Sequence, residues 1–490
     1  MKKVKYNIQS ATLIILLIFI GITSCSDDFV DVASEDENSE DFFNSEEDYQ
    51  SALIGAYDLL QSTYINVMLG EIASDNTLAG GESATDVPGI QEIDDMMHTP
   101  VNQQLRDIWS WMYAGVNRAN YIMEFKDKID FPGKEEVIGQ TRFLRAYYYF
   151  ELVKWFGDVP LAIDKRILFG EETEIDRVSK EQVYTLIEQD LLFAANNLPA
   201  TQAEIGRITQ GAARALLGKV YLYQDKFTEA ADVLDLVIEG PYDLVTDYNS
   251  IFEQEGENNI ESVFEIQYSD EEGAGFGCLQ CSEGNVAVGF NGIRNYSGPL
   301  FDSGFSFNVP TQEAFDAFED GDIRRDVAIL DIDAWAAAQG ATFSTGFEHT
   351  GYYNRKYIAR QGDLNTGDAN LTNPNNYRAI RFADVLLMAA EAHNRKPASN
   401  DTQAQLYLNR VRTRAQLPDV TATGSTLTDA ILQERRVELV GEGHRFFDLV
   451  RTGRAAQEIT GFSIGKHEVF PIPLIEIQLA GNRWQQNPGY

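Results

Sequence analysis

The residues that could catalyse a reaction do not fall into the spacing that a common mechanism needs. Gly461-Phe462-Ser463-Ile464-Gly465 matches the G-x-S-x-G pattern of serine hydrolases. Such a hydrolase also needs an acid and then a histidine after the serine, and no acid separates Ser463 from His467, the last histidine. The chain has no H-E-x-x-H zinc motif, no Gly-Lys-Ser/Thr phosphate loop and no spacing signal for a glycosidase carboxylate pair. We therefore expect a protein that is not an enzyme.

Metal-binding patterns are also incomplete. Asp320, Asp322, Asp331 and Asp333 offer oxygen atoms that suit calcium. The chain around them lacks the glycine and the terminal glutamate of the calcium-loop motif. A solvated acidic surface is the simpler interpretation, so calcium stays an alternative and no cofactor is expected.

Residues 1–24 read as a targeting segment that is not part of the fold. Three lysines are followed by the uncharged run Ala11–Ile22, which is short for a membrane span and typical of a signal-peptide core. Ile22-Thr23-Ser24-Cys25 then matches a lipobox, so we expect cleavage before Cys25 and lipidation of its thiol. An ordinary secretory signal that ends near a cysteine is the alternative.

Residues 25–46 carry many acids and no basic residue, so this segment should be a solvated tether. Its first residues, Ser26-Asp27-Asp28, have the form of an export signal to the outer leaflet, with a plain spacer as the alternative. Loss of the three leader lysines changes the net charge from −37 to −40 (−37 − 3). Such a surface repels nucleic acid, and no later segment is apolar enough to span a membrane. We expect attachment through lipid only, and no nucleic-acid partner.

Two further cysteines, Cys278 and Cys281, lie in a glycine-rich segment. A redox C-x-x-C motif normally lies where a strand enters a helix. Zinc would need two more ligands, and no nearby Cys or His supplies them. A local disulfide formed after export is the favoured interpretation.

A sugar-binding site needs other residue types than a catalytic or metal site. An aromatic ring packs against the C–H face of a pyranose, and polar side chains bind its hydroxyl groups. Trp111 shares a predicted helix face with Asp107 and Arg118, away from the apolar face, so we expect it to be exposed. Trp335 and Tyr296 lie in loop-rich sequence and are further candidates. For each ring, packing inside the protein is an equally good interpretation.

Helical periodicity dominates both ends of the mature chain. Within 209–239, Leu217-Gly218-x-x-Tyr221 and Ala230 match a tetratricopeptide repeat, in which small residues let two helices cross closely. Residues 261–268 alternate like a strand, and 269–312 show no helical period. Apolar residues recur at helical spacing in 47–62, 105–128, 134–156, 179–198, 382–395, 402–415 and 427–441.

These patterns predict a mainly α protein. We expect a tetratricopeptide-like helical repeat scaffold over 47–242, a loop-rich, ligand-binding second lobe with short strands over 243–379, and a helical region over 380–490.

Several sequence blocks together are similar to the SusD/RagB family, keep the family's order and cover nearly the whole mature chain. The blocks are Arg142–Pro160 (RFLRAYYYFELVKWFGDVP), Arg381–Ala392, Leu408–Arg412, Glu434–Arg451, Phe470–Pro473 and Gln486–Tyr490. The resemblance implies about four tetratricopeptide-like units and a loop-rich lobe. It also implies a non-catalytic, lipid-anchored protein at the cell surface of the outer membrane. Such proteins bind oligosaccharide or polysaccharide and deliver it to a SusC-like TonB-dependent barrel, on which they sit as lids.

The resemblance also gives the charged residues of these blocks a structural role, because charges near a core are normally paired. The expected internal pairs involve Arg142, Arg145, Glu434, Arg435, Glu438 and Asp448.

Family members often place ligand residues after the first helix, which adds Asp75 and Asn76 to the candidate site. We expect ligand on a loop-rich face formed by 269–345 with the segments around Asp75 and Trp111. The alternative is RagB-like capture of peptides on the same scaffold; a more remote one is a surface glycoside-processing enzyme. Strong acidity disfavours a polyanionic glycan.

Overall fold

The computed structural model describes residues 42–490 except 169, 364–365 and 369. The expected signal peptide, the lipidation site Cys25 and most of the acidic tether therefore lie outside the described residues. Helices dominate the described chain and strands are few and short, which confirms the predicted fold class. Among the described helices, none is long and apolar enough to cross a membrane.

The helices of the N-terminal half stack in chain order. α5 packs on α6, α6 on α7, α7 on α8 and α8 on α9, so each long helix is covered by the next. Successive packing of this kind is what a tetratricopeptide-like scaffold requires. The helices are α2 (Glu46–Asp58), α3 (Tyr64–Ile72), α4 (Pro88–Asp94), α5 (Gln103–Glu124), α6 (Lys134–Phe156), α7 (Lys180–Asn197), α8 (Gln210–Leu222) and α9 (Phe227–Ile238).

The stack continues across a long insertion. α9 packs against α14 (Phe382–Arg395), and α14 packs in turn against α15 (Asp401–Arg414) and α16 (Gly424–Glu438). The loop-rich part of the chain thus leaves and re-enters one scaffold between two neighbouring helices. Three short helices complete the C-terminal region: α17 (Arg445–Arg451), α18 (Ala455–Glu458) and α19 (Leu474–Leu479).

The crossing of α8 and α9 confirms the role predicted for small residues. A Cβ atom on Gly218 would lie 2.5 Å from the side chain of Leu234, closer than two carbon atoms can approach. Ala230, on the facing helix, is fully buried. Glycine at this position therefore sets the short distance between the two helices.

In its described residues, the loop-rich region is built from two-stranded sheets and short helices. β4 (Ser262–Ile266) confirms the strand predicted at 261–268 and pairs antiparallel with β10 (Tyr377–Arg381). The other antiparallel pairs are β1 (Thr77–Ala79) with β7 (Asn308–Pro310), β2 (Val159–Pro160) with β3 (Arg177–Val178), and β8 (Ile329–Asp331) with β9 (Tyr352–Asn354). β5 (Ile293–Arg294) pairs in parallel with β6 (Ser303–Gly304). The helices here are α10 (Val286–Asn291), α11 (Gln312–Asp316), α12 (Arg325–Ala328) and α13 (Ile332–Gln339).

One hydrophobic core joins the helical scaffold to β4 and β10, and two smaller cores lie in the loop-rich region. The main core begins inside the predicted tether, which departs from expectation. Phe43 is fully buried, with its ring centroid 4.7 Å from that of Tyr49 and 5.4 Å from that of Phe125. The burial of an aromatic ring fixes this end of the acidic segment to the fold.

The charges of the family-like blocks are paired inside the protein, as predicted. Arg145 donates hydrogen bonds of 2.7 and 2.9 Å to Asp190, and both side chains are buried. Arg435 donates to Asp384 at 2.7 Å and to Asp448 at 3.0 Å. The partners of the other motif charges are Asp190 and the Phe193 ring for Arg142, Arg324 and Arg412 for Glu434, and Arg324, Arg381 and Arg414 for Glu438.

The aspartates considered for calcium have other partners. The carboxylate of Asp322 is fully buried and accepts hydrogen bonds from Arg324. Asp331 caps α13 by accepting a 2.9 Å hydrogen bond from the backbone N–H of Ala334. Within the described residues, no group of three or more His, Cys, Asp or Glu side chains could hold a metal ion.

Candidate functional site

Among the aromatic ligand candidates, Tyr296 and Trp335 contact each other. The indole Nε1 of Trp335 donates a 2.9 Å hydrogen bond to the hydroxyl oxygen of Tyr296, which itself donates to the carbonyl of Pro299 at 2.8 Å. Both rings pack on Phe301 in a small core of the loop-rich region. Tyr296 is only 8% exposed and its hydroxyl group has two partners inside the loops, which agrees with the packing alternative for this ring. Trp335 is half-buried.

Asp75 and Asn76 follow α3 and are held by two arginines of the C-terminal region. Arg445 binds both carboxylate oxygens of Asp75, at 2.7 and 2.8 Å, and Arg436 approaches the same carboxylate at 3.0 Å. Burial opposes ionisation of Asp75, but Arg445 and Arg436 outweigh it and lower the pKa of this carboxyl group. Asn76 is fully buried and accepts a 2.9 Å hydrogen bond from Arg436. The structure therefore contradicts a surface contact by Asn76 and gives Asp75 a partner within the fold.

Trp111 corrects another expectation, because its side chain is only 8% exposed. Its ring lies 6.0 Å from the ring of Tyr64 in α3, centroid to centroid. Arg118, on the predicted solvent face of the same helix, forms an ion pair with Asp58, the last residue of α2. α5 is thus covered by α2 and α3 on the side that its own amphipathic pattern leaves to solvent.

An exposed aromatic ring occurs instead at Phe276, which sequence reasoning missed. Its side chain is 59% exposed, and its ring lies 5.9 Å from that of Phe305, centroid to centroid. Phe305 in turn packs on the buried Phe290 at 5.8 Å. The signal that could have found it is the triplet Gly275-Phe276-Gly277, since a ring between two glycines has little local cover.

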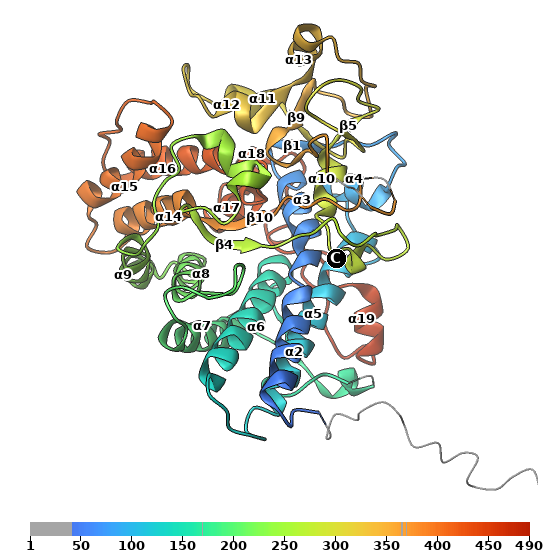
Figure 1. Ribbon diagram of the computed structural model, residues 1–490, viewed down its shortest axis with the longest axis vertical. Helices are drawn as coiled ribbons and strands as arrows, with labels where there is room; N and C mark the ends of the chain where they lie inside the picture. The colour runs from blue at the N-terminus through green and yellow to red at the C-terminus, as the bar shows by residue number, and fades with distance from the viewer. Residues whose placement is uncertain (1–41, 169, 364–365, 369) are drawn as a thin grey trace, which may run out of the picture.

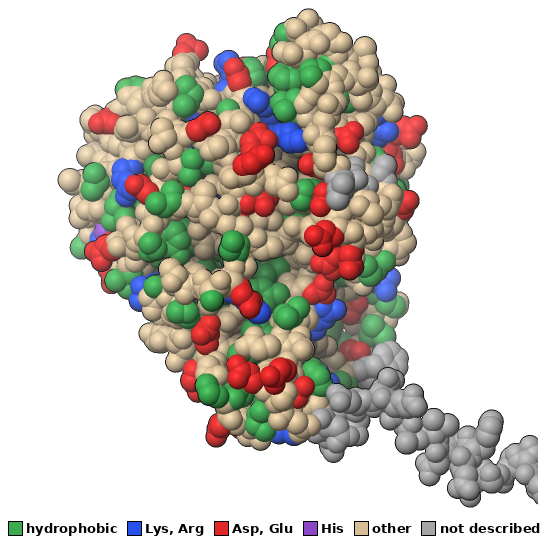
Figure 2. Space-filling view, in the orientation of Figure 1, with side chains coloured by type: hydrophobic (Ala, Val, Ile, Leu, Met, Phe, Trp, Pro, Cys, Tyr) green, Lys and Arg blue, Asp and Glu red, His purple; other side chains and the backbone are tan. Residues whose placement is uncertain are grey.

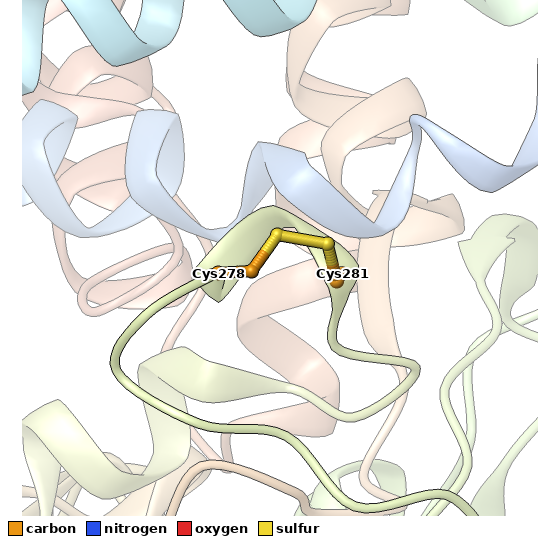
Figure 3. Close-up of a disulfide and its surroundings, with 2 residues drawn as sticks. All are labelled: Cys278 and Cys281. Atoms are coloured by element: carbon orange, nitrogen blue, oxygen red, sulfur yellow. A yellow bond between two sulfur atoms is a disulfide. The ribbon is translucent and has the colours of Figure 1, made fainter. Parts of the chain in front are cut away.

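A disulfide lies directly after this ring. Cys278 and Cys281 are bonded to each other, which confirms the local pairing favoured by the sequence (Figure 3). Close by, Gln61 donates hydrogen bonds to the carbonyls of Gln267 and Glu283, on either side of the disulfide segment. The disulfide thus closes the short turn 278–281 that follows Phe276, and Gln61 ties the chain on either side of it to the helical scaffold.

Polar groups adjoin the two rings. Arg294 donates a 2.7 Å hydrogen bond to the carbonyl of Phe305, and its guanidinium lies 3.6 Å from the carboxylate of Asp86. Asp86 accepts a 2.8 Å hydrogen bond from the backbone N–H of Glu82, which orders the exposed loop before α4. We call Phe276, Phe305, Arg294 and Asp86 the loop surface. It combines aromatic rings, a guanidinium and a carboxylate, the groups that bind sugar C–H faces and hydroxyl groups.

Arg294 belongs to β5 and Asp86 lies two residues before α4, and both elements are labelled in Figure 1. Acidic side chains are spread over the face of the molecule shown in Figure 2, as the net charge of −37 requires. An uncharged ligand meets no electrostatic barrier on approaching such a protein, whereas a polyanion does.

Two family profiles match the chain. The profile described as SusD family matches residues 260–469, and the one described as "Starch-binding associating with outer membrane" matches residues 28–222. A solved structure described as a laminarin-binding SusD-like protein is 36% identical, with a TM-score of 0.83, over 91% of this chain and 100% of its own. This chain belongs to the SusD family.

Other SusD-like proteins are similar over most of their length. Surface glycan-binding protein A from Bacteroides thetaiotaomicron, solved in complex with laminarihexaose, is 28% identical with a TM-score of 0.81. That match covers 90% of this chain and 99% of the other. SusD-like protein P2 of Formosa agariphila is 28% identical over 99% of this chain and 100% of its own. The helical stack with its inserted loop-rich region is thus the SusD fold.

Proposed function

We propose that this SusD-family protein is a non-catalytic, lipid-anchored protein of the cell surface that binds a neutral glycan at its loop surface. We also propose that the protein delivers this glycan to a SusC-like TonB-dependent barrel. The observation that carries the proposal is the 36% identity to a laminarin-binding SusD-like protein over the whole of that chain. Its other full-length relatives include surface glycan-binding proteins, which supports a binding role without catalysis.

The chemistry of the loop surface supports a sugar ligand. The exposed face of Phe276 offers a stacking platform that is already held by Phe305, so little side-chain freedom is lost on binding. Arg294, which binds the carbonyl of Phe305, and Asp86 supply a donor and an acceptor beside Phe305. Stacking and a few hydrogen bonds on an open surface give modest affinity, with Kd of about 1 µM to 1 mM.

Laminarin is the first glycan to test, because two relatives are described as binding laminarin or laminarihexaose. Laminarin in a native gel should slow the migration of the parent protein. Phe276→Ala should migrate closer to its position in a gel without laminarin. Ile464→Ala removes an apolar side chain elsewhere that is even more exposed (80%) and should stay retarded. Equal retardation of the parent and Phe276→Ala would place the site elsewhere. Retention of peptides but not of laminarin or starch would favour the RagB-like alternative.

Anchoring and delivery need separate experiments. Cys25→Ala should move the protein from the membrane fraction to a soluble one, and continued retention would count against the lipid anchor.

Affinity purification from outer membranes in mild detergent should recover a large TonB-dependent protein. Recovery of this chain alone in several detergents would contradict the delivery step.

A further inference from the structure

A cavity lies between α5 and α19, and its lining shares no residue with the loop surface. Its volume is about 320 Å³, within the usual range for a small-molecule pocket. Figure 1 shows α19 beside α5 on this side of the molecule. The walls come from the middle of α5, the segment 160–175, Glu476 of α19 and Trp484 of the C-terminal tail.

Three aromatic rings form its walls. The ring of Trp109 lies 4.9 Å from that of Tyr113 and 6.1 Å from that of Trp484, centroid to centroid. The rings of Tyr113 and Trp484 are inclined to that of Trp109 by 45° and 48°, so the three rings do not form one flat platform. We call Trp109, Tyr113 and Trp484 the aromatic cage.

The polar atoms of the cage are occupied by the protein, which leaves the ring faces for a ligand. Trp484 donates its indole N–H to the carbonyl of Ile175 at 2.8 Å, and Tyr113 donates to the carbonyl of Pro160 at 2.8 Å. Asn117 exchanges two 2.9 Å hydrogen bonds with the backbone of Ile167. These bonds fix the walls and use the donors of Trp484, Tyr113 and Asn117, while Ser110 also lines the cavity.

The charged groups in the lining are two carboxylates, Glu172 and Glu476, and no basic residue lines the cavity among the described residues. In the described part of the chain, no Lys or Arg nitrogen lies within 4.0 Å of either carboxylate. Burial raises the pKa of Glu476, the nearby Glu172 raises it further, and Arg106 and a hydrogen bond from the side chain of Trp109 oppose the change. The lining thus offers a cation two carboxyl groups and no basic side chain.

We propose that the aromatic cage binds an alkylammonium group, such as that of choline or of a lysine side chain. The negative faces of three inclined rings attract a compact cation, and Glu476 and Glu172 add charge complementarity. A flat pyranose suits this enclosure poorly, because it stacks on one ring face at a time. The inference is independent of the glycan site, since neither the residues nor the ligand chemistry are shared.

Isothermal titration of the soluble full-length protein with choline chloride tests this directly, with 3,3-dimethyl-1-butanol as a neutral compound of the same shape. Choline should bind saturably and the alcohol should bind at least about fivefold more weakly. Nα-acetyl-lysine amide is the second probe. Its binding, compared with that of choline, distinguishes a lysine side chain of a protein from a free quaternary ammonium compound as the ligand. Equal binding of choline and the neutral alcohol, or saturable binding of neither ammonium probe, would overturn the proposal.

Variants locate the binding. Glu476→Gln keeps the size of the side chain and should weaken choline binding at least about fivefold. Glu229→Gln, the same change on the exposed side of α9, should leave it unchanged. Trp484→Phe keeps an aromatic ring in the cavity wall. Titration measures its choline binding, and thermal denaturation shows whether it is still folded. Choline affinity that is unaffected by both Glu476→Gln and Trp484→Phe would show that the cation binds elsewhere.

Discussion

The ring of Phe276 meets the ring of Phe305 at 5.9 Å between centroids and 61° between planes, with Phe276 mostly exposed and Phe305 packed on the core. An exposed ring supported by a second ring keeps its position without being covered. This relationship distinguishes the loop surface from the aromatic residues suggested by the sequence, whose rings are largely covered.

Phe276→Ala should reduce glycan affinity at least about tenfold, because it removes the exposed stacking face. Its thermal stability should stay within about 1 kcal/mol of the parent, since most of the side chain already lies in water. Titration calorimetry and thermal denaturation measure the two effects. A large loss of stability together with lost binding would indicate that Phe276 supports the loop and does not contact the sugar.

Gly218→Ala should destabilise the protein by about 1–3 kcal/mol, because the new methyl group would overlap Leu234. Gly55→Ala is the matched control, since it also lies in a helix and a Cβ atom there meets nothing within 4 Å. That change should be neutral or stabilising by up to about 1 kcal/mol. Denaturant unfolding gives both values; equal effects would contradict the close crossing of α8 and α9.

Arg145→Met should cost about 3–5 kcal/mol, because it leaves the buried carboxylate of Asp190 with only the more distant Arg142, at 3.9 Å. Adding Asp190→Leu should recover much of that loss. Arg118→Met, which breaks an exposed pair with Asp58, should cost at most about 1 kcal/mol. Failure of the double variant to recover stability would show that Arg145 acts mainly through its other partners.

Asp94→Asn should make stability less dependent on pH. Burial raises the pKa of Asp94 to about 7, with Asp95 and Glu348 adding to the effect and a hydrogen bond from Ala79 opposing it. The folded protein therefore holds the proton more tightly than the unfolded chain, and stability is lost as pH rises from about 4 to about 7. The variant should exceed the parent by up to about 4 kcal/mol above pH 7 and match it near pH 4, because each pKa unit corresponds to about 1.4 kcal/mol. Denaturant unfolding from pH 4 to above pH 7 measures the difference in stability, and the exposed Asp419→Asn is the control. A constant difference at all pH values would contradict the shift.

The helical scaffold could be predicted because each of its elements has a local signal. Period-3.6 patterns marked the helices, and Gly218 marked a close crossing that the structure contains. Alternation marked β4, and two isolated cysteines marked the disulfide. These features depend on neighbours in the sequence.

The site residues depend on long-range packing, which one sequence does not show. Trp111 lies on the polar side of its helix, but α2 and α3 cover that side. Asn76 is enclosed by Arg436, a residue far along the chain. Trp109 and Trp484 come together only because the C-terminal tail returns to α5. The exposed Phe276 had a local signal in its flanking glycines, but no signal for its support by Phe305.

The most direct test of glycan binding at the loop surface is titration calorimetry of the soluble Cys25→Ala protein with laminarihexaose. One saturable site with Kd of about 1 µM to 1 mM is predicted, and Phe276→Ala should abolish the heat while Ile464→Ala preserves it. No saturable heat with the parent, or the same affinity in Phe276→Ala, would contradict the account.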